Sequence, residues 1–426
     1  MTIIVPGMTP TDFIAALNAN AVELVTTFDL DVNPFLTLTI SNATPVNISY
    51  NLRVSTVSYG QKGNSYIDTL NSFGQGDAFA LTVSDKAWVT KPSGYAMLPS
   101  FYAYPTIYNN TLYAVKNDGS RLASKSVDYG TTWTDFNKIF DAELYSIFAT
   151  KDGILFVCEG ATPLHPAGEK VWRSIDDGAN WTNVFTTTFG IITVWQWCQS
   201  EIDGTIYAGE YTGYDSDNAC YLWKSIDDGA NWTRIDLTMY GDRHVHHVMV
   251  DPITNRLYVS FGDINTRTYY SDDSGTTWTR IFNTYSAGFV GMTCLLNKRF
   301  FSDDRGDGNN NIWLSEDDAT LVSVFKPEDF ASTSWAEVVY VDGGTTLYCT
   351  FKNHYQIVGN AAIIAKSTDS GSTWTIISMF ASGVDSHHYH RFARDYRHRI
   401  PSGFGYFICN TLPGGGGLRG LIRIPV

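Results

Sequence analysis

Short runs of alternating apolar and polar residues, separated by turn residues, fill most of the chain after about residue 95. In the run LYVSF, for example, Leu257, Val259 and Phe261 alternate with Tyr258 and Ser260. A period of two places successive side chains on opposite faces of a strand, so this pattern predicts β-structure. Four such strands, HHVMVDP, RLYVSFGD, TRTYYSDD and TTWTRIF, form one unit. The same template fits the stretches around it, and the chain is predicted to be all-β over this region.

An eight-residue motif joins the third and fourth strands of this unit and recurs along the chain. It reads SVDYGTTW at 126–133, SIDDGANW at 174–181 and again at 225–232, SDDSGTTW at 271–278 and STDSGSTW at 367–374. A degenerate copy, SEDDATLV at 315–322, lacks the Gly and the Trp. The first serines stand at 126, 174, 225, 271, 315 and 367, so successive copies are 44 to 52 residues apart. A period in this range predicts a propeller or a solenoid.

Each position of the motif suits a tight turn. Gly supplies a positive φ, the Ser hydroxyl and the Asp carboxylate accept hydrogen bonds from turn amides, and the Trp anchors the turn to the sheet. Asp-x-Asp-x-Gly also occurs in calcium loops, but no Glu follows at the spacing that such a loop requires. We therefore expect structural turns that bind no metal. The residues concerned are Ser126, Asp128, Gly130, Trp133, Ser174, Asp176, Gly178, Trp181, Ser225, Asp227, Gly229, Trp232, Ser271, Asp273, Gly275, Trp278, Ser367, Asp369, Gly371 and Trp374.

These residues resemble the Asp-box (BNR) repeat of sialidase-like β-propellers, and the resemblance covers roughly residues 90–426. It implies a propeller with the Asp-box turns on one face and ligands on the other. The last unit, SHHYHRFAR, GYFICN and LRGLIRIPV, supplies only three strands, and an open edge would be left exposed. Residues 86–91, in which Trp88 stands like the motif Trp, are predicted to close it. This gives a seven-bladed propeller over 86–426; six blades, as in sialidases, is the alternative.

The sialidase active site does not carry over to this sequence. In that family the first arginine lies in a Phe/Tyr-Arg-Ile-Pro motif before the first Asp box. The similar stretches here, His398-Arg399-Ile400-Pro401 and Ile422-Arg423-Ile424-Pro425, both follow the last copy. Sialidase chemistry is therefore not expected.

Residues 1–85 are predicted to form a separate N-terminal domain with one helix and several strands. Thr9 suits the N-cap, Pro10 the first helical position, and Phe13, Leu17 and Leu24 lie at helical spacing. The stretch TPTDFIAALNANAVEL resembles a helix opening of phage tail and fibre proteins. That resemblance implies a virion surface protein whose N-terminal domain contacts other virion proteins, in a homo-oligomer that we expect to be a trimer.

Composition narrows the function further. The net charge of −14 makes nucleic acid an unexpected partner. The first residues, MTIIVPGMTPTDF, lack the pattern of a signal peptide, and no later window is apolar enough to span a membrane. The six cysteines lie in strand patterns without a CxxC pair, which favours buried free thiols and folding in a bacterial cytoplasm.

Polar and aromatic residues gather where the predicted inner strands begin and where the second strands end, on the expected ligand face. Histidines two apart on a strand point the same way and suit hydrogen bonding or acid–base chemistry, while Trp offers a platform to a sugar ring. The candidate ligand-binding residues are Trp195, Trp197, Glu210, His244, His246, Asp263, His388, His390 and Arg391. Histidines that merely line a wet central channel are the alternative interpretation.

Two other patterns are weaker. Asp303, Asp304 and Asp307, with asparagines 309–311, are rich in oxygen ligands for calcium, but a solvated loop is the favoured interpretation. Arg305-Gly306-Asp307 is interpreted as a chance tripeptide. No cofactor is expected. Three functions stay open: a virion protein that binds host surface polysaccharide without catalysis, a glycan-degrading hydrolase or lyase, and an intracellular scaffold.

Overall fold

The computed structural model describes residues 102–425 except for 117, 161–167, 213–219, 242, 263–265, 283–287, 305–309, 327–332, 342, 354–360, 382–389, 402–403 and 411–418. Before residue 102 it describes five short strands. The chain divides into two compact units, Met1–Lys91 with Ser378–Gly383, and Pro92–Ile377 with Val384–Val426. The sequence pattern predicted the boundary between the N-terminal domain and the propeller at residue 85.

The N-terminal unit contains two strand pairs. β1 (Thr2–Ile3) pairs in parallel with β2 (Val22–Glu23), and β3 (Leu36–Ser41) pairs in antiparallel fashion with β4 (Ala78–Val83). β3 and β4 fall in runs predicted to be strands. The predicted helix extended to Leu24, and this is wrong for Val22 and Glu23, which form β2 and pair with β1. Residues 4–21, which hold the rest of the predicted helix, lie outside the described part.

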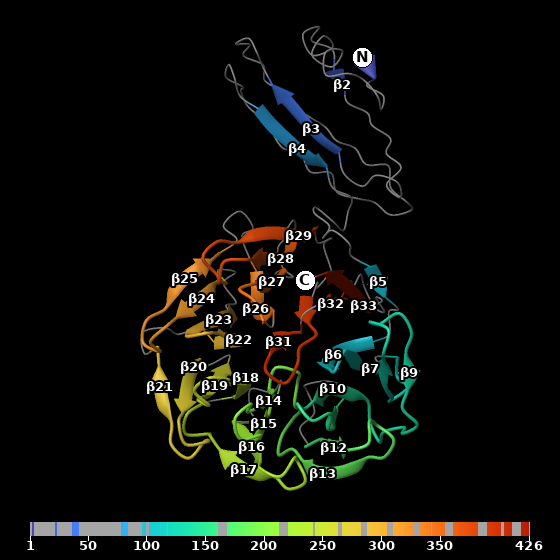
Figure 1. The fold of residues 1–426 in the computed structure, drawn as a ribbon, viewed down its shortest axis with the longest axis vertical. Helices are drawn as coiled ribbons and strands as arrows, with labels where there is room; N and C mark the ends of the chain where they lie inside the picture. Colours follow the sequence, from blue (N-terminus) through green and yellow to red (C-terminus); the bar gives the residue numbers. More distant parts are fainter. Residues whose placement is uncertain are drawn as a thin grey trace. The chain divides into compact units, whose positions relative to one another are not determined.

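The second unit is a β-propeller, and its described residues contain no helix, which confirms the predicted all-β fold class. Six of its sheets are built from consecutive strands, which Figure 1 shows arranged around a ring. The first three sheets consist of β6 (Tyr102–Tyr108), β7 (Thr111–Lys116), β8 (Ala123–Ser126) and β9 (Thr134–Asp135); β10 (Leu144–Ala149), β11 (Leu155–Glu159), β12 (Lys170–Ser174) and β13 (Thr182–Thr186); and β14 (Trp197–Gln199), β15 (Ile206–Gly209), β16 (Tyr221–Ser225) and β17 (Thr233–Asp236). The next three consist of β18 (His244–Val250), β19 (Leu257–Gly262), β20 (Arg267–Ser271) and β21 (Thr279–Ile281); β22 (Gly288–Leu295), β23 (Lys298–Asp304), β24 (Ile312–Ser315) and β25 (Val322–Phe325); and β26 (Thr333–Val341), β27 (Leu347–Asn353), β28 (Ala361–Ser367) and β29 (Thr375–Ala381), to which β31 (Arg399–Ile400) is added beside β26.

A further sheet joins the two ends of this unit. It has the order β30 (His390–Phe392), β32 (Phe404–Asn410), β33 (Arg419–Pro425) and β5 (Ala96–Leu98), with Leu98 opposite Leu421. A strand from the N-terminal side therefore completes the C-terminal sheet, as the three-strand unit required. The strand described in that position is β5; residues 86–91, predicted for it, lie outside the described part.

The recurring motif forms the same turn in each of its complete copies. At 225–232, the Ser225 Oγ donates to Asp227 Oδ1 (2.8 Å) and accepts from Gly229 N (2.9 Å), while Asp227 accepts from the Asn231 backbone and side chain (2.9 and 2.8 Å). Gly229 has φ of 77°, and its carbonyl accepts from Trp232 Nε1 (3.0 Å). Bonds from the Asn231 side chain lower the pKa of Asp227 to about 2. The turn is thus held by its own side chains.

The degenerate copy makes a turn that is one residue shorter. Asp317 Oδ1 accepts from Thr320 N (2.7 Å), and Ser315 Oγ accepts from Asp318 N (3.0 Å). Asp318 has a positive φ of 60°, as the residue before the Gly does in the complete copies. Loss of the Gly therefore shortens the turn without removing the Ser and Asp bonds. We refer to the six turns together as the repeated turns.

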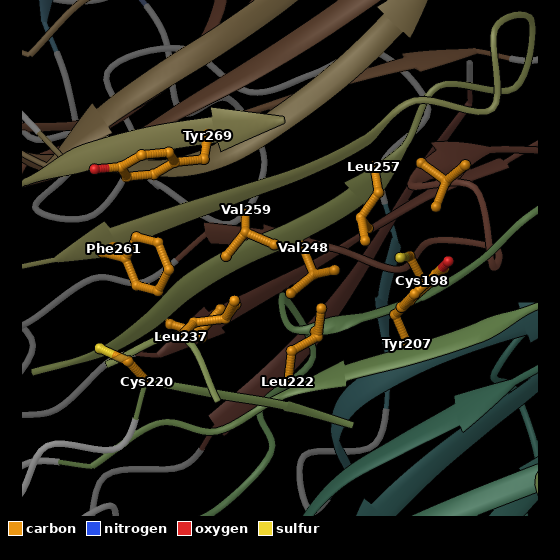
Figure 2. Packing of buried hydrophobic residues seen from close by; sticks show 12 residues of the cluster. Cys198, Tyr207, Cys220, Leu222, Leu237, Val248, Leu257, Val259, Phe261 and Tyr269 are labelled. Carbon is orange, nitrogen blue, oxygen red and sulfur yellow. The ribbon is translucent and has the colours of Figure 1, made fainter. Parts of the chain in front are cut away.

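Neighbouring sheets pack through apolar side chains from both. Figure 2 shows the cluster between the third and fourth sheets, where Leu222 and Leu237 meet Val248, Val259 and Phe261. All of these side chains are buried. The inner strands are buried on both faces, as β18 and β19 show at every position, whereas the outermost strands such as β17 are largely exposed.

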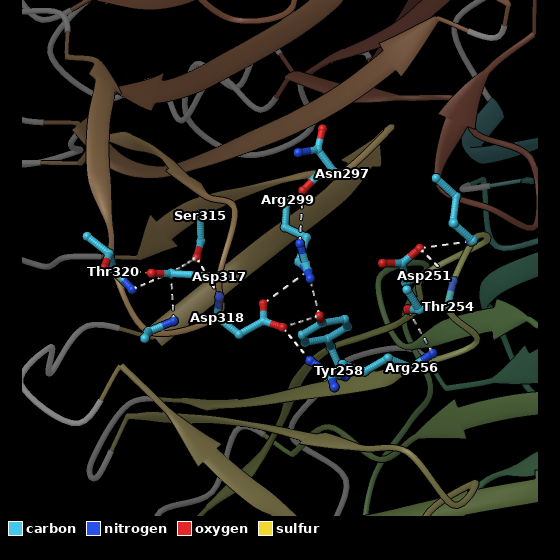
Figure 3. Close-up of polar contacts among 12 residues, drawn as sticks. Asp251, Thr254, Arg256, Tyr258, Asn297, Arg299, Ser315, Asp317, Asp318 and Thr320 are labelled. Carbon is cyan, nitrogen blue, oxygen red and sulfur yellow. Dashed lines mark hydrogen bonds and ion pairs between the residues drawn. The ribbon is translucent and has the colours of Figure 1, made fainter.

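Polar side chains also tie repeated turns to the preceding sheet. In Figure 3, Asp318 accepts from Tyr258 Oη (2.9 Å) and Arg256 Nη1 (2.6 Å), and Arg299 Nε lies 3.0 Å from its other oxygen. Two further such bonds run from Arg173 to the Asp228 carbonyl (2.8 Å) and from Lys224 to the Ser274 carbonyl (3.0 Å). The residue before the turn's Gly, or its equivalent Asp318, thus receives a cation from the neighbouring sheet.

Five cysteines are buried and free, which confirms the prediction for them: Cys158, Cys198, Cys220, Cys294 and Cys349. The side chain of Cys409 lies outside the described part. No described helix is long and apolar enough to cross a membrane.

Candidate functional site

The antiparallel order of the strands separates the propeller into two faces. The repeated turns and the hairpins between first and second strands lie on one face, which we call the turn face. The inner strands begin, and the second strands end, on the other face, which we call the strand-start face. The candidate ligand residues were predicted for the strand-start face.

An aromatic and imidazole stack lies at the start of β18 on the strand-start face. The Tyr211 ring centroid is 4.0 Å from that of His244, and the His244 centroid is 4.8 Å from that of His246. The two histidines therefore do lie on one side of their strand, as their spacing predicted. Both are buried, and Tyr211, half-buried, forms the outer member of the stack.

A β-bulge and a glycine give His246 its position. The pairing of β18 with β19 shifts between Val245 and His247, so His246 is the extra residue of the bulge. A Cβ on Gly262 would lie 1.8 Å from His246 Nε2, so the imidazole occupies the space that this glycine leaves open. Gln196 Nε2 donates to the carbonyls of Val245 (3.1 Å) and His246 (2.7 Å) and holds the bulged backbone. Gln196 stands between two predicted candidates, but no pattern in the sequence indicates this role.

Trp195 and Arg243, the residue before His244, are half-buried. The Trp195 carbonyl accepts from Val248 N (3.2 Å), which places Trp195 beside the middle of β18. Of the two predicted tryptophan platforms, Trp195 is the one that is not fully buried.

Trp197 is not a ligand platform, contrary to the prediction. Its ring has an exposed fraction of 0%, stacks on Phe148 at 5.3 Å, and donates from Nε1 to Ser146 Oγ (3.2 Å). Because β14 begins at Trp197, the strand's alternation turns this ring between the sheets while Trp195 remains outside.

Glu210 is likewise a structural residue. Its carboxylate accepts from Thr188 N (2.7 Å), Phe189 N (2.9 Å) and Trp223 Nε1 (2.6 Å), and it is fully buried. Burial raises the pKa of Glu210, and these bonds oppose that rise. The carboxylate is saturated by two amides of the β13–β14 connection and by the Trp223 indole, so the predicted role as an acceptor for sugar hydroxyls is wrong.

The same clamp recurs in other sheets. Glu159, at the end of β11, accepts from Asp141 N (2.8 Å), and Asp303 in β23 accepts from Asn311 N (2.6 Å) and Trp313 Nε1 (2.9 Å). Asp303, predicted as part of an oxygen-rich loop, is therefore occupied by backbone and indole donors. Among the described residues no group of three or more His, Cys, Asp or Glu is placed to hold a metal ion; Asp307 lies outside them.

The remaining candidates cannot be placed around the stack. Asp263 and His388 lie outside the described residues, and His390 and Arg391 are described only as backbone of β30.

A second polar cluster lies inside the ring, where residues 393–400, the axial segment, cross between β30 and β32. This segment bonds to the inner strands of several sheets: Thr106 Oγ1 donates to the Arg394 carbonyl (3.0 Å), Gln199 N to the Tyr396 carbonyl (3.2 Å), and Thr293 Oγ1 to the His398 carbonyl (3.3 Å). Its last residues form β31, which Figure 1 shows near the middle of the ring beside β26.

Two buried imidazoles meet in this axial cluster. His398 Nε2 lies 2.5 Å from the Trp197 carbonyl, which can only accept, so this nitrogen carries a proton. His398 Nδ1 then accepts from His247 Nε2 at 3.0 Å. Burial lowers the pKa of both histidines well below their usual range, and the positive charge of Arg394 adds to the effect. Both rings are therefore neutral near pH 7.

A buried ion pair completes the cluster. Arg394 Nη1 lies 3.2 Å from Glu337 Oε1, and Arg394 Nη2 donates to the Val194 carbonyl (3.2 Å). Both side chains are nearly inaccessible. The described side chains of the axial cluster, His247, His398, Arg394 and Glu337, bond to one another or to backbone carbonyls and are buried. The stack of Tyr211, His244 and His246 is the better candidate site.

No protein-family model matches the sequence, and none of the curated proteins matches it. Among solved structures, the chain is similar in fold to virginiamycin B lyase from Staphylococcus aureus, with 14% identity over 78% of this chain and 99% of the lyase and a TM-score of 0.52. It is similar to YCF48 bound to D1 peptide, with 13% identity, 81% and 97% coverage and a TM-score of 0.50. A GH74 xyloglucanase from Xanthomonas campestris matches at 15% identity and a TM-score of 0.49 over 66% of this chain; the chain spans 46% of that enzyme's length. At these identities the likeness shows the propeller fold alone.

Proposed function

We propose that this protein is a glycan-binding β-propeller that acts without catalysis, and that its binding site includes the stack of Tyr211, His244 and His246. The observation that carries the proposal is the stack itself, with Tyr211 4.0 Å from His244 and half-exposed on the strand-start face. An aromatic ring suits the apolar face of a sugar, and imidazole nitrogens suit its hydroxyls. Arg243 precedes His244 in the chain, Trp195 bonds through its carbonyl to Val248 of the same strand, and both half-buried side chains are proposed to extend the site.

The biological setting we propose is the surface of a phage virion. This part rests on the sequence: the stretch TPTDFIAALNANAVEL resembles openings of tail and fibre proteins, and the repeated turns resemble Asp boxes. The N-terminal unit would contact other virion proteins in a homotrimer, and the propeller would bind host surface polysaccharide. Sedimentation of the purified chain tests the trimer, since a monomer would contradict it.

The second candidate is a glycan-degrading enzyme that uses the same residues. Contact between a tyrosine and a histidine is the observation in its favour, because such a pair can donate and accept protons at one edge of a bound sugar. The solved propellers of similar fold include a lyase. Binding and catalysis give different outcomes on mutation, so one experiment separates them.

Purified protein is titrated with a panel of bacterial surface polysaccharides, and the products are assayed for new reducing ends and unsaturated sugars. The variants are Tyr211→Ala and His246→Ala; Tyr129→Ala, an exposed tyrosine of the turn face, is the matched control. We expect binding that weakens by about 1–3 kcal/mol in the first two variants, for a lost buried hydrogen bond or ring contact, and not in the control.

Product release by the wild type that is lost in His246→Ala while binding survives would replace the proposal with the enzyme. Binding that is equal in all variants would remove the stack from the site.

A further inference from the structure

The Gln196 side chain, just before β14, joins the third sheet to the fourth. It is fully buried. Its Nε2 donates to the carbonyls of Val245 (3.1 Å) and His246 (2.7 Å), and its Oε1 accepts from Thr193 N (2.9 Å) and from the Thr193 hydroxyl. An amide has two N–H donors and one acceptor oxygen, so both ends of this group are occupied and its orientation is fixed. One side chain therefore connects the turn at Thr193 with the bulge in β18.

The bulge in β18 needs such a partner. A β-bulge leaves its extra residue outside the ladder of strand pairing, and a buried carbonyl without a hydrogen bond costs free energy. His246 is that residue, and the Gln196 amide satisfies its carbonyl. Immediately after the bulge, His247 Nε2 donates to His398 Nδ1 (3.0 Å). The backbone of His246 is thus held by Gln196 and, through its neighbour, by the axial segment.

The position of the His246 ring follows from this backbone. A Cβ on Gly262 would lie 1.8 Å from His246 Nε2, and a Cβ on Gly288 would lie 3.1 Å from His246 Nδ1. The imidazole therefore occupies a space that these two glycines leave open. Because the ring is confined there, a change in the bulged backbone displaces the ring as well.

Gln196 also belongs to the segment that carries Trp195. The Trp195 backbone N donates to Thr193 Oγ1 (3.4 Å), the hydroxyl that bonds to the Gln196 amide, and the Trp195 carbonyl accepts from Val248 N (3.2 Å). The backbone of Trp195 therefore runs beside β18. Two residues of the proposed glycan site, Trp195 and His246, thus come from different sheets whose segments are joined through Gln196.

The axial segment anchors the same stretch on either side of Trp195 and Gln196. Arg394 Nη2 donates to the Val194 carbonyl (3.2 Å), and His398 Nε2 donates to the Trp197 carbonyl (2.5 Å). Both side chains are buried. Gln196 is therefore held in a fixed backbone, and its bonds to β18 place the bulge relative to that backbone.

We propose that Gln196 is a positioning residue of the glycan site, which fixes the segment of Trp195 and the bulge of His246 in one arrangement. This inference rests on the proposed function, because it assumes that a glycan contacts these residues. Groups that are already in place need not be ordered when the glycan binds, so the affinity depends on the Gln196 amide although that amide is too deeply buried to touch the sugar.

The tested variant is Gln196→Leu, and Gln199→Leu is its matched control. Gln199 is also buried, at 2% exposure, and lies in β14. Its side chain accepts from Lys151 N (2.8 Å) and donates to the Gly204 carbonyl (3.1 Å), in hairpins of the turn face. Both substitutions remove buried hydrogen bonds and should lower the Tm, but only one of them releases the bulge. Thr193→Val, which removes only the hydroxyl at Gln196 Oε1, is the milder variant should Gln196→Leu fail to fold.

Binding is measured with purified bacterial capsular polysaccharides at a temperature where thermal melting shows every variant to be folded. We expect Gln196→Leu to bind about tenfold more weakly than the wild type, Thr193→Val to be intermediate, and Gln199→Leu to equal the wild type. A second readout needs no glycan. In protein labelled with ¹⁵N-histidine, the imidazole signals of His246, assigned with His246→Gln, should move in Gln196→Leu and stay in place in Gln199→Leu.

The outcomes separate this inference from the proposed function. If Tyr211→Ala loses affinity while Gln196→Leu and Thr193→Val keep it, the glycan site stands and the positioning role of Gln196 is refuted. Equal losses in Gln196→Leu and Gln199→Leu, or unmoved His246 signals, would also refute that role, because general destabilisation would then explain any effect. A wild-type protein that binds none of the polysaccharides would overturn the proposed function, and this inference with it.

Discussion

Acid should unfold the propeller through the two neutral histidines of the axial cluster, His247 and His398. Burial lowers the pKa of both well below the usual value, while in the unfolded chain each titrates near 6.5. Between those values the unfolded state binds more protons than the folded state. The stability contribution is therefore fully present above about pH 6.5 and is lost as the pH falls toward the folded-state pKa values.

The slope follows from the number of protons. Each histidine that is protonated only in the unfolded state contributes about 1.4 kcal/mol per pH unit, so the pair contributes up to about 2.7 kcal/mol per unit. Arg394, Glu337 and His246 surround the pair, and the positive charge of Arg394 opposes protonation of either ring. Asp227 of a repeated turn, with a pKa of about 2, loses its contribution only below about pH 4 and does not interfere.

The assay is urea unfolding followed by tryptophan fluorescence from pH 5 to 8, with wild type compared with His398→Gln. Glutamine keeps an N–H for the Trp197 carbonyl but cannot be protonated in this range. The variant should show a slope between pH 5 and 6 that is smaller by about 1.4 kcal/mol per unit. Glu210, whose raised pKa titrates with the opposite sign, is common to both proteins and cancels in the difference. Equal slopes in the two proteins would refute the argument.

Three further predictions concern packing and position. Trp232→Ala should lower the free energy of unfolding by about 3–5 kcal/mol, because the ring packs at 4.8 Å from Phe185; a loss below 1 kcal/mol in urea unfolding would contradict this. Asp318→Asn should destabilise by roughly 3 kcal/mol, since it leaves the cations of Arg256 and Arg299 without their shared carboxylate, and calorimetry showing an unchanged Tm would count against that role. Gly262→Ala should displace the His246 ring, 1.8 Å from the new Cβ, and reduce glycan affinity more than it reduces Tm; unchanged affinity would place the ligand elsewhere.

The sequence by itself determined the local elements and their repetition. A period of two, the motif Ser-x-Asp-x-Gly-x-Thr/Asn-Trp and the spacing of its copies predict four-stranded units joined by tight turns, and the hydrogen bonds of the turns are local to eight residues. The need for a strand to complete the last sheet was also visible, because three C-terminal strands leave an open edge. The residues that supply this strand could not be predicted, because β5 does not contain the repeated motif.

Tertiary structure decided what the candidate residues do. Trp195 and Trp197 are two positions apart, yet one is half-exposed and the other fully buried, because the strand β14 begins only at the second. Glu210 was predicted to bind a ligand because the residues next to it in the sequence do not reveal its hydrogen-bond donors. The backbone amides of Thr188 and Phe189 and the Trp223 indole saturate its carboxylate only in the folded protein.

The axial cluster is the clearest case of what only the fold decides. His247 and His398 lie 3.0 Å apart but are separated by 151 residues, and a pairing over that distance depends on the ring having closed. A pattern of neighbouring residues predicts in which strand a side chain lies and to which side of the strand it points. It does not predict which distant side chain lies beside it. Burial next to each other desolvates both imidazoles, and desolvation keeps them neutral.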